Sequence, residues 1–156
     1  MKVLFFHGLE GNPNGTKIQF LKANGCEVVA PALSRDDFDG DLRSAQQAFD
    51  EQQPDVVVGS SRGGAVAVNI DAGDTPLVLI APAWQHWGTA TSVNANTTIL
   101  HSQQDDLVPI AGSRQLLSNS GLPAERLVVV GKEHRMSDDE ALQALLEAVR
   151  GAGHPG

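Results

Sequence analysis

Six short apolar runs, several of them nearly unbroken in valine, isoleucine, leucine and phenylalanine, constrain the fold of this chain more than any other feature of its sequence. Strands that are buried on both faces of a parallel sheet show such runs, whereas strands with one wet face alternate between apolar and polar residues. We therefore expect six strands in one parallel sheet, at residues 3–6, 27–30, 55–58, 77–80, 97–100 and 126–130.

The segments between these runs carry helical patterns, so strands and helices alternate along the chain. Asp41 is the predicted N-terminal cap of the second helix, and Ser137 with Glu140 forms a predicted capping box at the last. Such alternation predicts an α/β fold with a doubly wound sheet, right-handed crossovers and helices on both faces. We expect the helices at residues 16–24, 41–53, 62–70, 110–119 and 137–150.

The chain has 156 residues, a length that fits one domain with one core. We assign residues 1–150 to this domain and expect residues 151–156 to form a flexible tail. Residues 84–96 are the one long stretch without a helix or strand pattern, and loops of that length are often functional.

The charge of the chain excludes several classes of partner. Its formal net charge of -8 argues against nucleic acid and against an anionic membrane surface, both of which demand a basic face. The first apolar run is too short to span a membrane, so we expect a cytoplasmic protein. Cys26 is the single cysteine and is expected to be an inert, buried thiol. No histidine, cysteine, aspartate or glutamate cluster has metal-ligand spacing, so we expect neither metal nor cofactor.

The third run leads into a Gly-x-Ser-x-Gly sequence that is followed by a predicted helix. A nucleophile at the end of a central strand needs a very sharp turn, and Gly59 and Gly63 leave room for that turn around Ser61. Ser60 lacks such flanking glycines. Similar turns bind phosphate in other doubly wound proteins, so a nucleotide or flavin binder is the alternative interpretation.

A serine nucleophile needs a base, and the base needs an orienting carboxylate, in the chain order serine, acid, histidine. Asp105 and Asp106 follow the fifth run and His134 follows the sixth, where the loops at the carboxyl ends of parallel strands meet. His134 is the predicted base, whereas His7 and His101 lie at strand ends and are interpreted as structural. Chemistry alone does not separate the two aspartates.

Acyl transfer also needs two N–H groups that point at the developing oxyanion. The residue after the nucleophile supplies one of them, here the backbone of Arg62. The loop after the first run supplies the other, and Gly8 lets this loop turn so that the N–H of Leu9 is the predicted second donor.

With these motifs the chain resembles the α/β-hydrolase superfamily, and within it the small, cap-free bacterial serine esterases. Four motifs in order carry the resemblance: His7-Gly8, Gly59-x-Ser61-x-Gly63, His101-x-x-x-Asp105-x-x-x-Pro109, and the late His134. The resemblance selects Asp105 as the acid and implies six parallel strands in the order 2-1-3-4-5-6. Two positions depart from the family pattern: Ser102 stands where glycine is preferred, and Arg62 where an apolar residue or glutamine is common.

The resemblance implies hydrolysis of a small ester through an acyl-serine. We expect a monomer or a small homo-oligomer. Ser61 would attack, His134 would take its proton, and Asp105 would orient His134. Trp84 and Trp87, in the place of the usual cap, either wall a substrate pocket or anchor the loop. A thioesterase or amidase shares this machinery, and a lyase or acyltransferase remains a further alternative. A non-catalytic binding module on the same scaffold is the alternative from a different class.

Overall fold

A computed structural model of the chain describes residues 1–9 and 11–152, and it contains one sheet of six parallel strands. The strand order is β2-β1-β3-β4-β5-β6, so the predicted order is confirmed. The strands are β1 Lys2–Phe6, β2 Glu27–Val29, β3 Val56–Ser60, β4 Leu77–Ile80, β5 Thr97–His101 and β6 Leu127–Val129.

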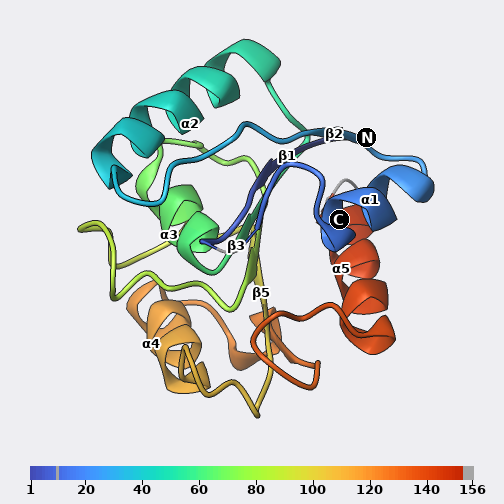
Figure 1. Cartoon of the computed structure of the whole chain (residues 1–156). Coiled ribbons are helices and arrows are strands. Elements are labelled where there is room, and N and C mark those ends of the chain that lie inside the picture. The colour runs from blue at the N-terminus through green and yellow to red at the C-terminus, as the bar shows by residue number, and fades with distance from the viewer. Residues whose placement is uncertain (10, 153–156) are drawn as a thin grey trace.

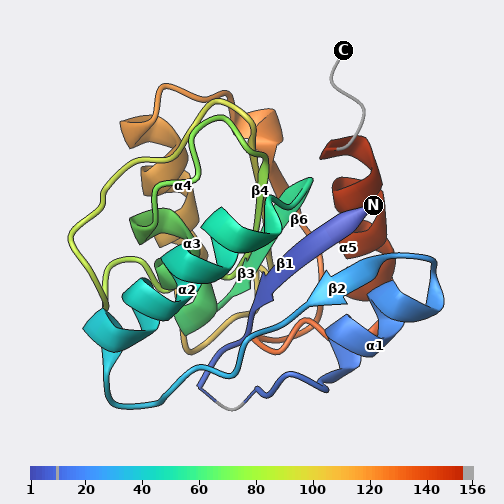
Figure 2. The same cartoon turned by 90° about the horizontal axis from the view of Figure 1, so that it is seen from above.

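Helices cover both faces of this sheet, as the alternation predicted. Helices α1 and α5 lie on one face, and α2, α3 and α4 lie on the other (Figure 1). The turned view in Figure 2 again separates α1 and α5 from α2 and α3. The helices are α1 Thr16–Ala23, α2 Phe38–Gln52, α3 Arg62–Asn69, α4 Ile110–Asn119 and α5 Asp139–Ala152, with a short 3-10 helix at Ala124–Arg126.

The core is divided into two layers by the sheet, because successive strand residues point to opposite faces. In β1, Leu4 and Phe6 pack with the layer under α2, α3 and α4, whereas Val3 and Phe5 pack with the layer under α1 and α5. All four side chains are at most 2% exposed, which explains the unbroken apolar runs. The edge strand β6 differs, since Val129 is 48% exposed.

The start of α2 differs from the prediction. This helix begins at Phe38, and its cap is Asp37, whose carboxylate accepts a hydrogen bond of 2.9 Å from the N–H of Gly40. Asp41, the predicted cap, lies inside the helix and is buried because it forms an ion pair with Arg62. The prediction was wrong because a buried partner distant in the sequence, and not a cap, explains this aspartate.

Both ends of α5 also differ from the prediction. Asp138 receives the hydrogen bond from the N–H of Ala141 at 3.3 Å, whereas the hydroxyl of Ser137 donates to the carbonyl of Arg135. The predicted capping box at Ser137 is therefore wrong. At the other end the helix continues to Ala152, because this residue still packs against the core, and residues 153–156 of the predicted tail lie outside the described residues.

None of the helices described in the structure is long and apolar enough to cross a membrane.

Candidate active site

The turn between β3 and α3 has the strained backbone that the Gly-x-Ser-x-Gly sequence predicts. Ser61 has φ 56° and ψ -115°, a left-handed conformation that a residue with a side chain rarely adopts. Two hydrogen bonds hold it there: the N–H of Ser61 donates to the carbonyl of Ile80 at 2.9 Å, and the N–H of Ala83 donates to the carbonyl of Ser61 at 3.0 Å. The neighbouring strand β4 and the segment after it thus fix the serine.

The glycines around Ser61 are required by close packing of the backbone. A Cβ atom on Gly59 would lie 2.5 Å from the carbonyl oxygen of Gly63, and one on Gly63 would collide with the carbonyl of Phe6. Gly8 also packs closely against this turn, since a Cβ on it would lie 3.2 Å from the carbonyl oxygen of Ser60. The strand end, the turn and the loop after β1 therefore meet at Ser61.

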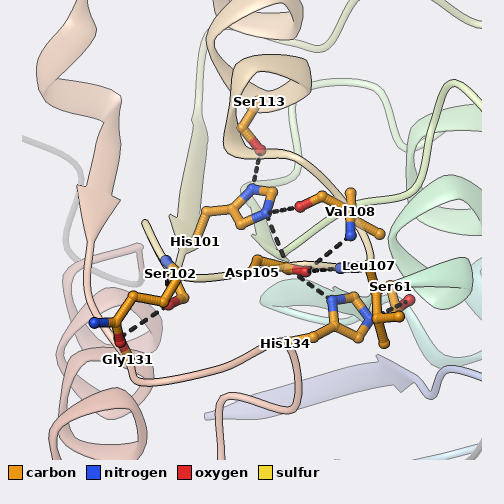
Figure 3. A network of polar contacts seen from close by, with 10 residues as sticks. Ser61, His101, Ser102, Asp105, Leu107, Val108, Ser113, Gly131 and His134 are labelled. Carbon is orange, nitrogen blue, oxygen red and sulfur yellow. Dashed lines mark hydrogen bonds and ion pairs between the residues drawn. The ribbon is translucent and has the colours of Figure 1, made fainter.

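The three predicted catalytic side chains lie in one hydrogen-bonded chain (Figure 3). His134 Nδ1 lies 2.7 Å from Asp105 Oδ2, and His134 Nε2 lies 2.9 Å from Ser61 Oγ. A carboxylate only accepts, so Nδ1 carries the proton and Nε2 is left to accept from the serine hydroxyl. The side chain of Asp105 is 0% exposed and that of His134 is 16% exposed.

Asp105, and not Asp106, is the aspartate beside His134. Its second oxygen, Oδ1, accepts hydrogen bonds from the N–H groups of Leu107 at 2.9 Å and Val108 at 2.8 Å. Burial by itself raises the pKa of Asp105, but the hydrogen bonds from Val108 and His134 outweigh it and hold this pKa below its ordinary value. Asp105 is therefore ionised at neutral pH, whereas Asp106 is exposed to solvent.

His101 is buried, as expected for a structural histidine, but it also touches Asp105. Its Nε2 lies 2.8 Å from the carbonyl of Val108 and 3.2 Å from Asp105 Oδ2, and its Nδ1 lies 2.6 Å from Ser113 Oγ (Figure 3). A carbonyl only accepts, so Nε2 carries the proton and Nδ1 accepts from the serine hydroxyl. Burial lowers the pKa of His101, which keeps the ring neutral. The four-residue spacing to Asp105 was the sequence signal for this contact.

Ser102, the first departure from the family pattern, joins the loops that carry the acid and the base. Its hydroxyl donates to the carbonyl of Gly131 at 3.0 Å and accepts from the N–H of Gln104 at 3.0 Å. A glycine at this position could not make either bond. The departure thus has a structural role close to Asp105.

Arg62, the second departure, has a buried side chain that is 2% exposed. Its guanidinium lies 2.6 Å from Asp41 and 5.2 Å and 5.7 Å from the ring centres of Phe38 and Trp87. The cation is thus paired with Asp41 and lies close to two aromatic rings. The hydrogen bonds from Ser34 and Arg62 outweigh the effect of burial and hold the pKa of Asp41 below its ordinary value.

The two predicted oxyanion donors are the N–H groups of Arg62, which directly follows Ser61, and of Leu9. Arg62 is the first residue of α3, so its N–H has no partner within the helix. Leu9 lies in the loop after β1 and lines the same cavity as Ser61. His7 fixes this loop: its Nε2 accepts from the N–H of Leu33 at 3.0 Å, and its Nδ1 donates to the carbonyl of Gly8 at 2.8 Å.

A cavity of about 560 Å³ opens beside Ser61 and His134. Trp87 lines it, but Trp84 does not. The indole of Trp84 is 7% exposed, packs in the core and donates to the carbonyl of Gly112 at 2.9 Å. The structure therefore does not bring Trp84 to the predicted substrate pocket, because this side chain anchors the loop to α4.

Two cationic residues that the sequence analysis did not single out also line the cavity, Lys17 and Arg135. Burial, with a smaller effect of the charge of Arg135, lowers the pKa of Lys17 from 10.5 to about 8. The sequence feature that could have drawn attention to Lys17 is its position in the first turn of a helix, where the helix dipole disfavours a cation. Within residues 1–9 and 11–152, no group of three or more histidine, cysteine, aspartate or glutamate residues could hold a metal ion.

Comparison with known proteins agrees with this architecture. No protein-family model and no curated protein matches the sequence. Among solved structures, alpha/beta hydrolase domain-containing protein 10 from mouse has a TM-score of 0.76 at 17% identity, covering 96% of this chain and 88% of its own. Est1E from Butyrivibrio proteoclasticus has a TM-score of 0.72 at 16% identity, covering 96% and 85%. A monoacylglycerol lipase from Paleococcus ferrophilus has a TM-score of 0.73 at 13% identity, covering 97% and 94%.

At these identities the likeness shows the fold. The chain thus has the α/β-hydrolase fold, and its neighbours span almost the whole of its length.

Proposed function

We propose that this protein is a serine hydrolase that cleaves small carboxylic esters through an acyl-serine intermediate. The observation that carries the proposal is the hydrogen-bonded chain from Asp105 through His134 to Ser61, whose serine stands in a strained turn beside a cavity. The esterase and the lipase among the structural neighbours are consistent with this reaction class.

In the first half of the reaction His134 Nε2 takes the proton of Ser61 as its oxygen attacks the ester carbonyl. Asp105 stays ionised and stabilises the imidazolium that forms, since its own pKa is lowered. The N–H groups of Leu9 and Arg62 donate to the oxyanion of the tetrahedral intermediate. His134 then returns the proton to the departing alcohol, which leaves an acyl group on Ser61.

In the second half His134 removes a proton from water, and the hydroxide attacks the acyl-serine. The second tetrahedral intermediate collapses, the proton returns to Ser61, and the carboxylic acid leaves the cavity. Thioesters and amides would follow the same steps with a different leaving group.

The test is hydrolysis of 4-nitrophenyl acetate and butyrate, followed by nitrophenol absorbance and by intact mass spectrometry of the quenched enzyme. We expect turnover by the wild type and a trapped adduct with the mass of the acyl group. Ser61→Ala and His134→Ala should each lose at least about a thousandfold in kcat. Turnover that survives in Ser61→Ala would contradict the proposal.

A further inference from the structure

The described residues that line the cavity differ in charge from the chain as a whole. The chain carries 19 aspartate and glutamate residues against 11 lysine and arginine residues. No carboxylate is among the described residues that line the cavity, whereas Lys17 and Arg135 both line it. An acidic protein thus places Lys17 in the wall of the cavity that also contains Ser61 and His134.

Lys17 has no ion pair or hydrogen bond to any residue that the structure describes. It is partly buried, and the charge of Arg135 acts on it unfavourably. Burying an ammonium group without a partner is unfavourable. Many lysines avoid this cost because only the aliphatic stem is buried and the charge stays in solvent. Among residues 1–9 and 11–152, the cavity wall therefore contains a cation, Lys17, that has no protein partner.

The start of α1 adds to this positive potential. The cap residue, Gly15, has no side chain to accept hydrogen bonds, and the first turn contains no acidic residue. Thr16, Lys17 and Ile18 all line the cavity, and the first N–H groups of a helix have no partner within it. The positive end of the helix dipole thus lies at the wall that Lys17 also lines.

We propose that the substrate is an ester that carries a carboxylate away from the scissile bond, and that Lys17 binds this carboxylate in the cavity. This inference rests on the proposed function, because it names the substrate class of the same site. A volume of about 560 Å³ is ample for such a molecule beside Ser61. A charge-assisted hydrogen bond in a partly buried site is worth roughly 10- to 100-fold in binding.

The experiment compares kcat/KM for two matched pairs of esters. In the first pair, 4-nitrophenyl adipate carries the carboxylate in the acyl part, and 4-nitrophenyl hexanoate is its neutral counterpart. In the second pair, 4-carboxyphenyl butyrate carries it in the alcohol part, and 4-carbamoylphenyl butyrate is neutral. The readout is the ratio of kcat/KM for the anionic ester to that for the neutral ester, at pH 7.

The ratio is measured for the wild type, Lys17→Met, Lys17→Arg and Lys22→Met. Lys22 is the matched control, since it lies exposed in the last turn of the same helix. We expect the ratio in at least one pair to fall tenfold or more in Lys17→Met, to be largely retained in Lys17→Arg, and to be unchanged in Lys22→Met.

Two negative results are distinguishable. Hydrolysis of the neutral esters, with ratios in both pairs that Lys17→Met leaves within twofold of the wild type, would overturn this inference and leave the proposed function intact. Hydrolysis of none of the four esters by the wild type would contradict both. Lys17→Gln serves as a second neutral variant if Lys17→Met does not fold.

Discussion

Asp105 and Asp106 are neighbours with the same side chain, and their surroundings give them different roles. The carboxylate of Asp105 accepts from two backbone N–H groups as well as from His134, whereas Asp106 is exposed. The sequence alone placed both in the right loop but could not separate them, because the direction of a side chain in a loop depends on backbone hydrogen bonds that leave no pattern. The family resemblance, through the spacing from His101, selected Asp105.

The first prediction concerns this pair. Asp105→Asn should lower kcat for 4-nitrophenyl butyrate by about 10³- to 10⁴-fold, because an amide no longer holds His134 in the tautomer that accepts from Ser61. Asp106→Asn, the matched control, should stay within about twofold of the wild type. Equal losses in the two variants would contradict the assignment of the acid.

Lys17 illustrates how a binding residue can be unfavourable for stability. Its pKa is about 8 in the folded protein against an ordinary 10.5, so the folded state holds the proton less tightly than the unfolded chain does. The unfavourable contribution is therefore complete below pH 8, declines between pH 8 and 10.5, and vanishes above that range.

The second prediction follows from that sign. Lys17→Met should raise the free energy of unfolding at pH 7 by about 1–2 kcal/mol, a value reduced from the full shift because the lysine is partly solvated. Urea unfolding at pH 7 and at pH 10 measures the change, and the difference from the wild type should narrow at pH 10. Lys22→Met should change neither value. A less stable Lys17→Met, by the same amount at both pH values, would count against the buried charge.

Among the elements, the β3–α3 turn was the easiest to predict and the most constrained. A glycine two residues before and two residues after Ser61 is a steric requirement, and steric requirements are visible in sequence. Element ends were harder, as Asp41 and Ser137 show. Both side chains are polar and lie near helix starts. Asp41 is paired with the distant Arg62, whereas Ser137 donates to the nearby carbonyl of Arg135, so neither caps its helix.

The third prediction tests the steric argument. Gly59→Ala should lower the free energy of unfolding by at least about 3 kcal/mol, since its Cβ would lie 2.5 Å from the carbonyl oxygen of Gly63. Gly151→Ala is the control, because nothing lies within 4 Å of a Cβ there, and it should be neutral or slightly stabilising. Urea denaturation measures the free energy of unfolding of both variants. A Gly59→Ala protein as stable as the wild type would contradict the packing described for the turn.

For the molecule as a whole, the strands and the two helical layers could be predicted because buried strands and amphipathic helices have distinct periodicities. The strand order was implied by the family resemblance. Which residues line the cavity could not be predicted from these periodicities. Trp84 and Trp87 are three residues apart in one loop, yet the first is in the core and the second lines the cavity. Only the three-dimensional path of the loop separates these two environments.

The fourth prediction uses the two tryptophans as a matched pair. Trp87→Ala should raise KM for 4-nitrophenyl hexanoate several-fold while the free energy of unfolding changes by about 1 kcal/mol or less, because the indole covers the cavity and stacks on Arg62. Trp84→Ala should instead lose about 3–5 kcal/mol of stability, since it empties part of the core. Michaelis kinetics together with urea unfolding separate the two effects, and the reverse pattern would contradict the described loop.

Labelling with a fluorophosphonate probe shows whether Ser61 is an activated nucleophile. The wild type, Ser61→Ala and Ser60→Ala are treated side by side and read by intact and peptide mass spectrometry. We expect one adduct, on Ser61, that is absent only in Ser61→Ala. No adduct in the wild type, or an adduct that persists in Ser61→Ala, would contradict this role of Ser61.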